Sequence, residues 1–337
     1  MADDIPYPFI AMVGQLEMRF ALMLALINPS VGGVLLIGPR GVGKTTCVRS
    51  LTGILPEVLI PVDKDGVPIS ESDEEEADVR YERVKLIELP LNARLEDVVG
   101  GINERIAIQQ QRVRLERGIL ARADQNLLYV DEVNLLDDQI VDAILDASAQ
   151  GHYTVRRGAM AGTYRSRFVL IGSMNPEEGD LRPQIMDRFG LRVIVRGLER
   201  KEDRLEIYKR VRAYRENPRT FLQEWASLTS QIREEVGLAR DLLKETTVSD
   251  EALELGIKLV HQLGIDSTRA EFTMFEAARA HAAADGRDVA DVRDLRFVAP
   301  LALRQRRSVY MNEFFDHQLQ EDGQINTAFD QLLNGNS

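Results

Sequence analysis

The sequence is poor in the residues that hold disulfide-rich proteins and metal clusters together. Its 337 residues include a single cysteine, Cys47, and four histidines. One cysteine excludes a disulfide framework or a cysteine-based metal cluster within one chain, and the histidines are too far apart to form a ligand motif. We therefore expect no structural metal, and we expect Cys47 to be a small core residue on a helix. The histidines are His152, His261, His281 and His317.

Long hydrophobic runs are also missing. No stretch reaches the roughly 18 apolar residues of a membrane-spanning helix, and no signal peptide is recognisable. The balance of 44% hydrophobic and 28% charged residues is typical of a globular chain with room for two domains. We expect a soluble protein that stays in the compartment where it is made.

Basic residues are fewer than acidic ones. The sequence has 42 Lys and Arg residues and 54 Asp and Glu residues, which give a net charge of -12. Such a chain as a whole disfavours nonspecific binding to polyanions. A local basic channel remains an alternative, because two segments, 105–122 and 156–167, are rich in arginine. The second alternates around a Gly-containing turn, as a hairpin does. We expect both to be exposed hairpins, or to pair with acids of a neighbouring subunit, rather than to bind nucleic acid.

What the sequence does contain is a complete phosphate-binding loop. Residues 38–45 are GPRGVGKT, a Gly-x-x-x-x-Gly-Lys-Thr motif, and they follow an apolar run at 34–37 that predicts a buried strand. The glycines let backbone N–H groups point at phosphate oxygens, Lys44 supplies a point charge, and the Thr45 hydroxyl is a ligand for Mg²⁺. A glycine-rich surface turn would not require this Lys-Thr pair. The predicted nucleotide-binding residues are Gly38, Pro39, Arg40, Gly41, Val42, Gly43, Lys44, Thr45 and Thr46.

Two further apolar runs end in polar residues of the kind that hydrolysis requires. Residues 127–130 are followed by Asp131, which can hold Mg²⁺, and Glu132, which can activate water. An acidic helix cap is the local alternative. Residues 168–172 lead to Asn175, which we predict to orient the attacking water, although Asn-Pro after a strand is by itself usually a turn.

Strand-like and helical patterns alternate up to residue 197. This alternation predicts a parallel sheet covered by helices on both faces. The phosphate loop and the two acids then lie at the carboxyl ends of strands, where open α/β sheets bind ligands. Beyond residue 198 amphipathic helical patterns dominate and predict a helical second domain. The β-like runs are 34–37, 84–89, 127–130, 168–171 and 191–195, and the helical patterns include 202–215, 251–263 and 270–284.

The order of these motifs resembles that of the AAA+ ATPases, and closely resembles the family of the I subunit of magnesium chelatase. The resemblance depends on VGQ at 13–15, the GPRGVGKT loop, LLYVDEVNLL at 127–136 and GSMNPEEGDLRPQIMDRFGL at 172–191. It extends from residue 7 to about residue 307 and is weakest in the tail and in the acidic tract ISESDEEEAD at 69–78. We expect this tract to be a solvated loop rather than a store of Mg²⁺, because a run of charges lacks the fixed oxygen geometry that Mg²⁺ requires.

The resemblance implies an α/β fold of the AAA+ P-loop NTPase type. A parallel five-stranded sheet would occupy residues 1–198, and a smaller all-helical lid domain, packed differently from most AAA+ lids, would occupy residues 199–337. It also implies an ATPase that uses ATP and Mg²⁺ to drive insertion of Mg²⁺ into protoporphyrin IX, for chlorophyll or bacteriochlorophyll biosynthesis. The location would be cytoplasmic or, for a mature plastid protein, the plastid stroma.

The partners follow from the same resemblance. The porphyrin would sit on a separate large subunit, a second AAA+ subunit would couple the two, and the ATPase itself would form a homo-oligomeric ring, a hexamer in this family. Arg188 matches the family's arginine finger, which reaches the γ-phosphate bound by the adjacent subunit and is worth roughly 10³ to 10⁵ in rate. Arg269 matches its sensor-2 arginine at the start of a lid helix. A salt bridge is the alternative for each arginine. The predicted catalytic residues are Glu132, Asn175, Arg188 and Arg269, and the predicted metal ligands are Thr45 and Asp131.

Two other functions remain open from the sequence. Within the same class, the chain could be the ATPase of a cobalt chelatase or a general AAA+ metal-insertion chaperone. From another class, it could be a nucleic-acid motor of the helicase type. ATPase activity that DNA stimulates, with a steep dependence on salt, would favour the helicase.

Overall fold

The computed structural model describes residues 5–62, 78–102, 115–158 and 160–307. Its centre is a five-stranded sheet in the order β11-β1-β10-β7-β4, in which every neighbouring pair is parallel. The predicted parallel sheet is confirmed, although β4 begins at Leu86 and β10 continues to Met174. The strands are β1 (Val34–Ile37), β4 (Leu86–Leu89), β7 (Leu127–Val130), β10 (Val169–Met174) and β11 (Leu191–Ile194).

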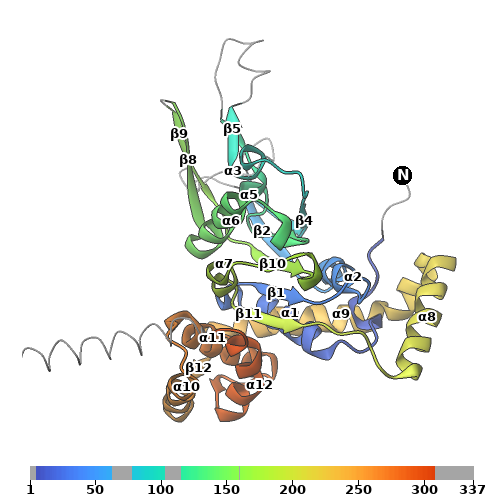
Figure 1. Ribbon diagram of the computed structural model, residues 1–337. Helices are drawn as coiled ribbons and strands as arrows, with labels where there is room; N and C mark the ends of the chain where they lie inside the picture. Colours follow the sequence, from blue (N-terminus) through green and yellow to red (C-terminus); the bar gives the residue numbers. More distant parts are fainter. Residues whose placement is uncertain (1–4, 63–77, 103–114, 159, 308–337) are drawn as a thin grey trace, which may run out of the picture.

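Successive residues of the central strands face opposite layers of the molecule. Val34 and Leu36 of β1 lie in one buried cluster with α1 (Leu16–Ile27), whereas Leu35 lies in a second cluster with α6 (Asp138–Gln150). Figure 1 shows the sheet between these two helices. Burial on both faces explains why the strands are continuous apolar runs rather than alternating patterns.

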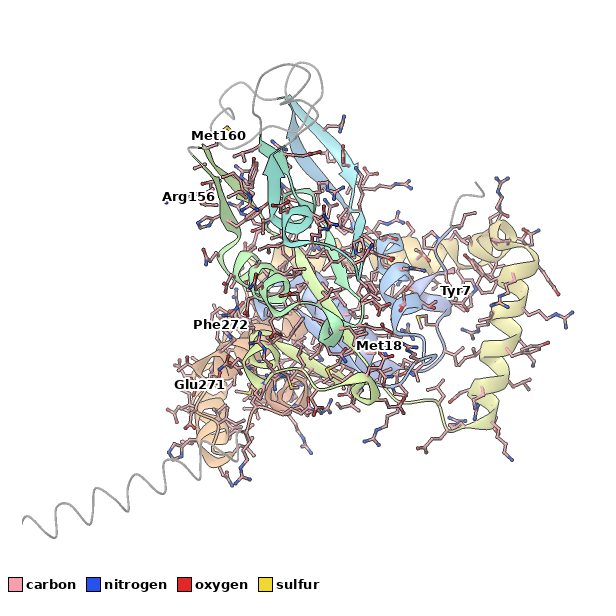
Figure 2. All side chains as sticks on the ribbon, turned by 45° about the horizontal axis from the view of Figure 1, so that its top comes forward. Tyr7, Met18, Arg156, Met160, Glu271 and Phe272 are labelled. Carbon is pink, nitrogen blue, oxygen red and sulfur yellow. The ribbon has the colours of Figure 1, made fainter. Side chains whose placement is uncertain are left out.

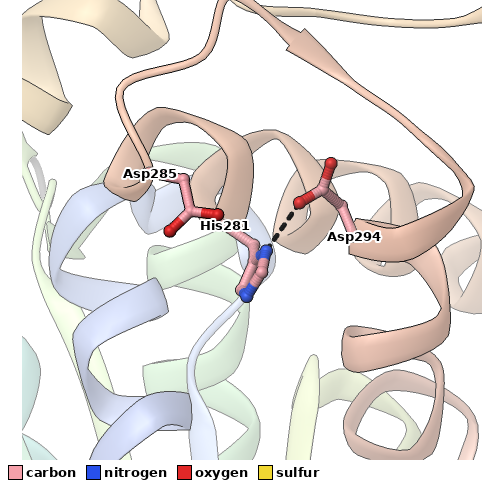
Figure 3. A group of neighbouring side chains, drawn as sticks. All are labelled: His281, Asp285 and Asp294. Atoms are coloured by element: carbon pink, nitrogen blue, oxygen red, sulfur yellow. Dashed lines mark hydrogen bonds and ion pairs between the residues drawn. The ribbon is translucent and has the colours of Figure 1, made fainter.

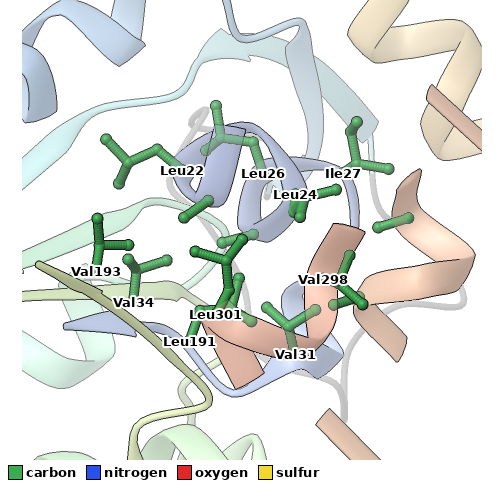
Figure 4. Close-up of a cluster of buried hydrophobic side chains, with 14 of the residues drawn as sticks. Leu22, Leu24, Leu26, Ile27, Val31, Val34, Leu191, Val193, Val298 and Leu301 are labelled. Atoms are coloured by element: carbon green, nitrogen blue, oxygen red, sulfur yellow. The ribbon is translucent and has the colours of Figure 1, made fainter. Parts of the chain in front are cut away.

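The C-terminal helices share the first of these clusters. Figure 4 shows Leu26 of α1, Leu191 of β11, and Val298 and Leu301 of α12 (Val292–Leu303) gathered around one buried region. Helix α12 is therefore packed directly against the α/β part of the chain. Where one domain ends and the next begins remains a prediction, with residue 198 as the proposed boundary.

The described residues after β11, 195–307, are mainly helical, as the amphipathic patterns predict. Three of these helices begin at side-chain caps: the side chains of Asn217, Ser249 and Asp291 accept hydrogen bonds from the backbone N–H groups of Thr220, Ala252 and Arg293 respectively. A short parallel strand pair, β12 (Thr247–Val248) with β13 (Val289–Ala290), is added to the helices. The remaining helices are α8 (Lys201–Glu216), α9 (Pro218–Leu243), α10 (Asp250–Gln262) and α11 (Thr268–Ala284).

Antiparallel hairpins extend from the α/β part. The predicted hairpin is confirmed as β8 (His152–Arg157) paired with β9 (Met160–Arg165), and Figure 2 shows Arg156 and Met160 near its outer end. Of the other arginine-rich segment only residues 115–122 are described, and the acidic tract at 69–78 lies outside the description except for its last residue. The sequence did not predict β2 (Glu57–Val62) with β3 (Asp78–Arg83), or β5 (Gly100–Ile102) with β6 (Leu115–Arg117).

Short helices complete the description and set up the site. Among the described residues, none of the helices has both the length and the apolar character needed to cross a membrane. The short α-helices are α2 (Lys44–Ser50), α3 (Leu95–Val99), α5 (Ile119–Arg122) and α7 (Pro183–Arg188). The 3₁₀ helices are η1 (Phe9–Ala11), η2 (Pro29–Val31), η3 (Leu51–Gly53), η5 (Val133–Leu135) and η6 (Pro176–Glu178).

Candidate nucleotide site

The phosphate loop connects β1 to α2, and its glycines are required by the fold. A Cβ on Gly38 would lie 2.1 Å from the carbonyl oxygen of Val195, next to β11, so no larger residue fits. Gly41 and Gly43 have φ values of +80° and +91°, in the left-handed region that residues with a Cβ rarely adopt. The backbone N–H groups of the loop and of the first turn of α2 can therefore surround an anion.

Lys44 is folded over the loop that it belongs to. Its Nζ donates to the carbonyl oxygens of Gly38 at 2.5 Å and Pro39 at 2.9 Å, and the residue is 9% exposed. Burial lowers the pKa of Lys44, and the neighbouring carboxylates, Asp131 first, act in the opposite direction. A phosphate in the loop would offer this ammonium group a charged partner in place of two carbonyl oxygens.

Asp131 is held by two hydroxyl groups on neighbouring strands. The hydroxyl of Tyr129 donates to Oδ1 of Asp131 at 2.8 Å, and Ser173 forms a short hydrogen bond to the same oxygen. Oγ1 of Thr45 lies 3.5 Å from Oδ2 of Asp131 and 3.2 Å from the tyrosine hydroxyl. The predicted metal ligands, Thr45 and Asp131, thus offer a hydroxyl oxygen and a carboxylate oxygen, and Mg²⁺ prefers oxygen ligands of this kind. The residues present therefore fit a magnesium ion bound between the loop and β7.

Glu132 has an unusual backbone and an arginine partner. Its φ and ψ are 52° and 51°, a left-handed conformation that is uncommon for a residue other than glycine. The backbone N–H of Glu132 donates to Oγ of Ser173 at 3.2 Å, which helps to hold this conformation. Its carboxylate accepts a hydrogen bond from Nη2 of Arg40 at 3.0 Å, and the same nitrogen forms an ion pair with Glu178.

Asn175 is buried at the end of β10, with 4% of its surface exposed. Its Oδ1 accepts a hydrogen bond from the backbone N–H of Glu177 at 3.3 Å, so it caps η6, as the turn alternative predicts. It also lines the cavity that the loop and the acids surround. The turn and the orienting role are therefore compatible.

The cavity has a volume of about 250 Å³. Typical ligand pockets measure roughly 300–1,000 Å³, so this cavity suits the phosphate end of a nucleotide rather than the whole molecule. It brings together most of the residues that the sequence predicts for one chain. The lining residues are Arg40, Gly41, Val42, Gly43, Lys44, Thr45, Thr46, Asp131, Glu132, Ser173, Met174 and Asn175.

Arg188 and Arg269 do not line this cavity. Arg188, at the end of α7, forms ion pairs with Asp142 at 3.3 Å and Asp146 at 2.9 Å on α6. Nη1 of Arg269, on α11, lies 3.6 Å from a carboxylate oxygen of Asp187. In Figure 1 α7 and α11 lie on the other side of β1 from α2. Each arginine thus forms the intrachain ion pair that the alternative predicts, and neither lines the cavity of its own chain.

Asp187 is a residue that sequence reasoning missed. Its carboxylate pairs with Arg306 at 2.6 Å, Arg192 at 3.6 Å and Arg269 at 3.6 Å, and accepts a hydrogen bond from Ser267. Burial lowers the pKa of Arg192 to about 10 and also lowers that of Arg306. This cluster joins the last turn of α7 to β11, to α11 and to the segment that follows α12. It therefore couples the helix that bears Arg188 to the C-terminal helices.

One other group in the described residues has the composition of a metal site. His281, Asp285 and Asp294 lie close together in the C-terminal helices, and Figure 3 shows Nδ1 of His281 directed at Asp294, 2.6 Å away. Arg287 already pairs with both carboxylates, and these hydrogen bonds, to Asp294 first, raise its pKa. We interpret the group as an ion-pair anchor, because a guanidinium already provides the positive charge that a metal would supply.

Comparison with known families agrees with this geometry. The family model for magnesium chelatase, subunit ChlI, matches residues 9–184, and that for the AAA lid domain matches residues 247–327. A magnesium-chelatase subunit ChlI homolog of Methanocaldococcus jannaschii is 41% identical over 313 residues, which cover 89% of this chain and 85% of the relative. The magnesium-chelatase 38 kDa subunit of Rhodobacter capsulatus is 39% identical over 309 residues, which cover 89% of this chain and 87% of the relative.

Solved structures give the same answer. A cryo-EM-based structure of the complex between subunits BchI and BchD of magnesium chelatase contains a chain with 38% identity and a TM-score of 0.52. The match covers 90% of this chain and 97% of that one. A putative ATPase from Cytophaga hutchinsonii matches with 21% identity and a TM-score of 0.61. This match covers 88% of this chain and 83% of that one, and it supports the fold alone. With its phosphate loop, paired acids and family matches together, the chain belongs to the ChlI family of magnesium chelatase subunits, within the AAA+ ATPases.

Proposed function

We propose that this chain is the ATP-hydrolysing subunit of a magnesium chelatase, and that it drives insertion of Mg²⁺ into protoporphyrin IX held by a partner subunit. One observation above all supports the proposal. The phosphate loop and the acids after β7 meet around a single cavity, in a chain that matches chelatase subunits over 89% of its length. This family membership implies ATP and Mg²⁺ as cofactors.

The nucleotide-binding role belongs to the loop and the two metal ligands. Backbone N–H groups from Gly41 to Thr46 would surround the phosphates, and Lys44 would bind the β- and γ-phosphates in place of its carbonyl partners. Thr45 and Asp131 would hold Mg²⁺, with Asp131 oriented by the hydroxyls described above. When bound, the ion would offset the charge that develops on the phosphates.

Hydrolysis requires a base and an oriented water. Glu132 lies beside the loop, with its backbone preset, and would accept the proton of the attacking water. Asn175 would hydrogen-bond that water from the end of β10. Removal of the proton by a positioned base contributes roughly 10² to 10⁴ in rate.

Arg188 and Arg269 are proposed to act on a neighbouring subunit. Both lie away from the cavity of their own chain and are partly exposed, at 33% and 47% of their side chains. Head-to-tail contacts would place them near the γ-phosphate of the next copy, and such contacts generate a ring, hexameric in the proposal. A monomer would then be a poor ATPase.

The proposal also names partners and a location. A second AAA+ subunit and a porphyrin-binding large subunit complete the chelatase, and the solved complex of BchI with BchD is the support for the former. Pairing of the arginine-rich hairpin with acids of a neighbouring subunit also remains a proposal. The location proposed is the cytoplasm, or the plastid stroma for a plastid protein.

A reconstituted chelatase tests the function. The chain alone should hydrolyse MgATP and leave protoporphyrin unmetallated, and addition of the two partner subunits should produce Mg-protoporphyrin, which fluorescence detects. Glu132→Gln should abolish that product. Insertion of cobalt alone into a corrin precursor would keep the fold and the ATPase but refute the magnesium assignment, and ATP-driven DNA unwinding would refute the chelatase function altogether.

A further inference from the structure

The guanidinium of Arg40 bridges two glutamates at the edge of the nucleotide cavity. Nη2 lies 3.0 Å from Oε1 of Glu132 and also pairs with Oε1 of Glu178. The three residues come from different segments: the phosphate loop, the turn after β7, and η6 after β10. One side chain of the loop therefore connects the ends of three adjacent strands.

Stability of the fold does not explain this arrangement. The side chain of Arg40 is 67% exposed, and an ion pair of so exposed a group contributes little to the stability of a fold. The glutamates are more enclosed, at 22% for Glu132 and 20% for Glu178. Oε2 of Glu178 is buried without a hydrogen-bond partner among the described residues. A carboxylate so placed needs a cation nearby, and Arg40 provides it.

Arg40 also offsets part of the negative charge at the cavity. Asp131, Glu132 and Glu178 all act on the ionisation of Lys44, and Arg40 acts on it with the opposite sign, so these groups share one small space. A triphosphate would add further negative charge there. Without Arg40, Glu132 would be repelled both by Glu178 and by the phosphate that its water must attack.

We propose that Arg40 is a positioning residue that holds the side chain of Glu132 beside the phosphate loop, and that Glu178 acts only by anchoring Arg40. The backbone of Glu132 is preset in its left-handed conformation, but its side chain has Arg40 as the hydrogen-bond partner found in the described residues. This inference rests on the proposed function, because it requires Glu132 to act as the base.

Steady-state kinetics on the whole 337-residue chain can test the proposal. Arg40→Ala should lower kcat about 10- to 100-fold, the cost of a misplaced catalytic group, and should leave the affinity for a fluorescent ATP analogue close to wild type. Arg40→Lys should restore only part of kcat, because an ammonium lacks the planar fork that engages two carboxylates. Glu178→Gln should reduce kcat less than Arg40→Ala, and the double variant should be no slower than Arg40→Ala alone.

The matched control is Arg212→Ala, which removes an exposed arginine that pairs with Glu216 on α8. Thermal unfolding verifies that each variant is folded. A loss of nucleotide affinity with unchanged kcat would show that Arg40 binds phosphate instead, and unchanged kinetics would reduce it to a surface ion pair. Additive losses in the double variant would give Glu178 a separate role and overturn the anchoring.

If wild type hydrolyses ATP, Glu132→Gln does not, and Arg40→Ala hydrolyses it at the wild-type rate, this inference fails while the proposed function stands. If wild type does not hydrolyse ATP under any assembly condition, the proposed function fails first.

Discussion

The hydroxyl of Tyr129 provides a direct test of how Asp131, the proposed metal ligand, is held. It donates to Oδ1 of Asp131 at 2.8 Å and lies 3.2 Å from the hydroxyls of both Thr45 and Ser173. Burial raises the pKa of Tyr129, so the hydroxyl keeps its proton and remains a donor. Tyr129→Phe removes the donor and keeps the ring, which is packed in the core.

The size of the effect follows from the bond that is lost. A hydrogen bond to a charged group contributes about 1.5–3 kcal/mol, and 1.4 kcal/mol corresponds to a factor of about ten. Ser173 still donates to the same carboxylate oxygen, so we expect the lower end of this range. Tyr129→Phe should therefore weaken the apparent affinity for Mg²⁺ by about tenfold, within the roughly 10- to 100-fold cost of losing an outer-shell partner. Adding Ser173→Ala should increase the loss, because Oδ1 of Asp131 then keeps neither hydroxyl.

The assay is ATP hydrolysis at saturating ATP, with free Mg²⁺ as the variable. Tyr7→Phe is the control, because it removes a hydroxyl that donates to the carbonyl oxygen of Ala11, away from the cavity. Thermal unfolding verifies that the variants are folded. An unchanged half-saturating Mg²⁺ concentration in the folded Tyr129→Phe, Ser173→Ala double variant would refute the reasoning, because it would show that these hydroxyls do not tune the metal ligand.

Three more predictions concern the base, the ring and the C-terminal helices. Glu132→Gln should bind ATP but hardly turn it over, because an amide cannot accept the proton, and separate measurements of binding and hydrolysis check this. Arg188→Ala and Lys44→Ala should each be inactive but regain some hydrolysis when mixed; no recovery in rings shown by mass to be mixed would place Arg188 in its own chain or in a structural role. Burial opposes ionisation of Asp294, but hydrogen bonds, from Arg287 first, outweigh it and hold its pKa below the usual range. The stability that this carboxylate contributes should be complete above about pH 4 and be lost as pH falls further, so the unfolding temperature of wild type should drop more steeply there than that of Asp294→Asn.

Much of the fold was predictable because its signals are local. The apolar runs of the central strands are continuous since both of their faces are buried, and the glycine spacing of the phosphate loop follows from what its backbone must do. The hairpin β8 with β9 shows the same kind of short-range alternation. The hairpins β2 with β3 and β5 with β6 were missed, because 15 and 12 residues separate their strands in the sequence, far more than the short loops of two to about five residues that make a hairpin recognisable.

The candidate site was predictable in its parts but not in its connections. Gly38 could be assigned to a loop, but only the approach of Val195 next to β11 shows why no side chain fits there. Tyr129 looked like one more apolar strand residue. Only the structure shows that its hydroxyl donates to Asp131. Because β7 and β10 are neighbours in the sheet, Ser173 reaches the same carboxylate.

By itself, the sequence determined the kind of chemistry to expect: a phosphate loop, a candidate metal-binding aspartate, a candidate base, and the helical and strand segments that present them. The tertiary structure alone decided which side chains meet. It placed Arg40 between Glu132 and Glu178, and it set Arg188 and Arg269 away from the cavity of their own chain. The physical reason is that motifs and periodicity describe neighbours along the chain, whereas these contacts depend on the order in which the strands are placed in the sheet and on how the last helices pack against it.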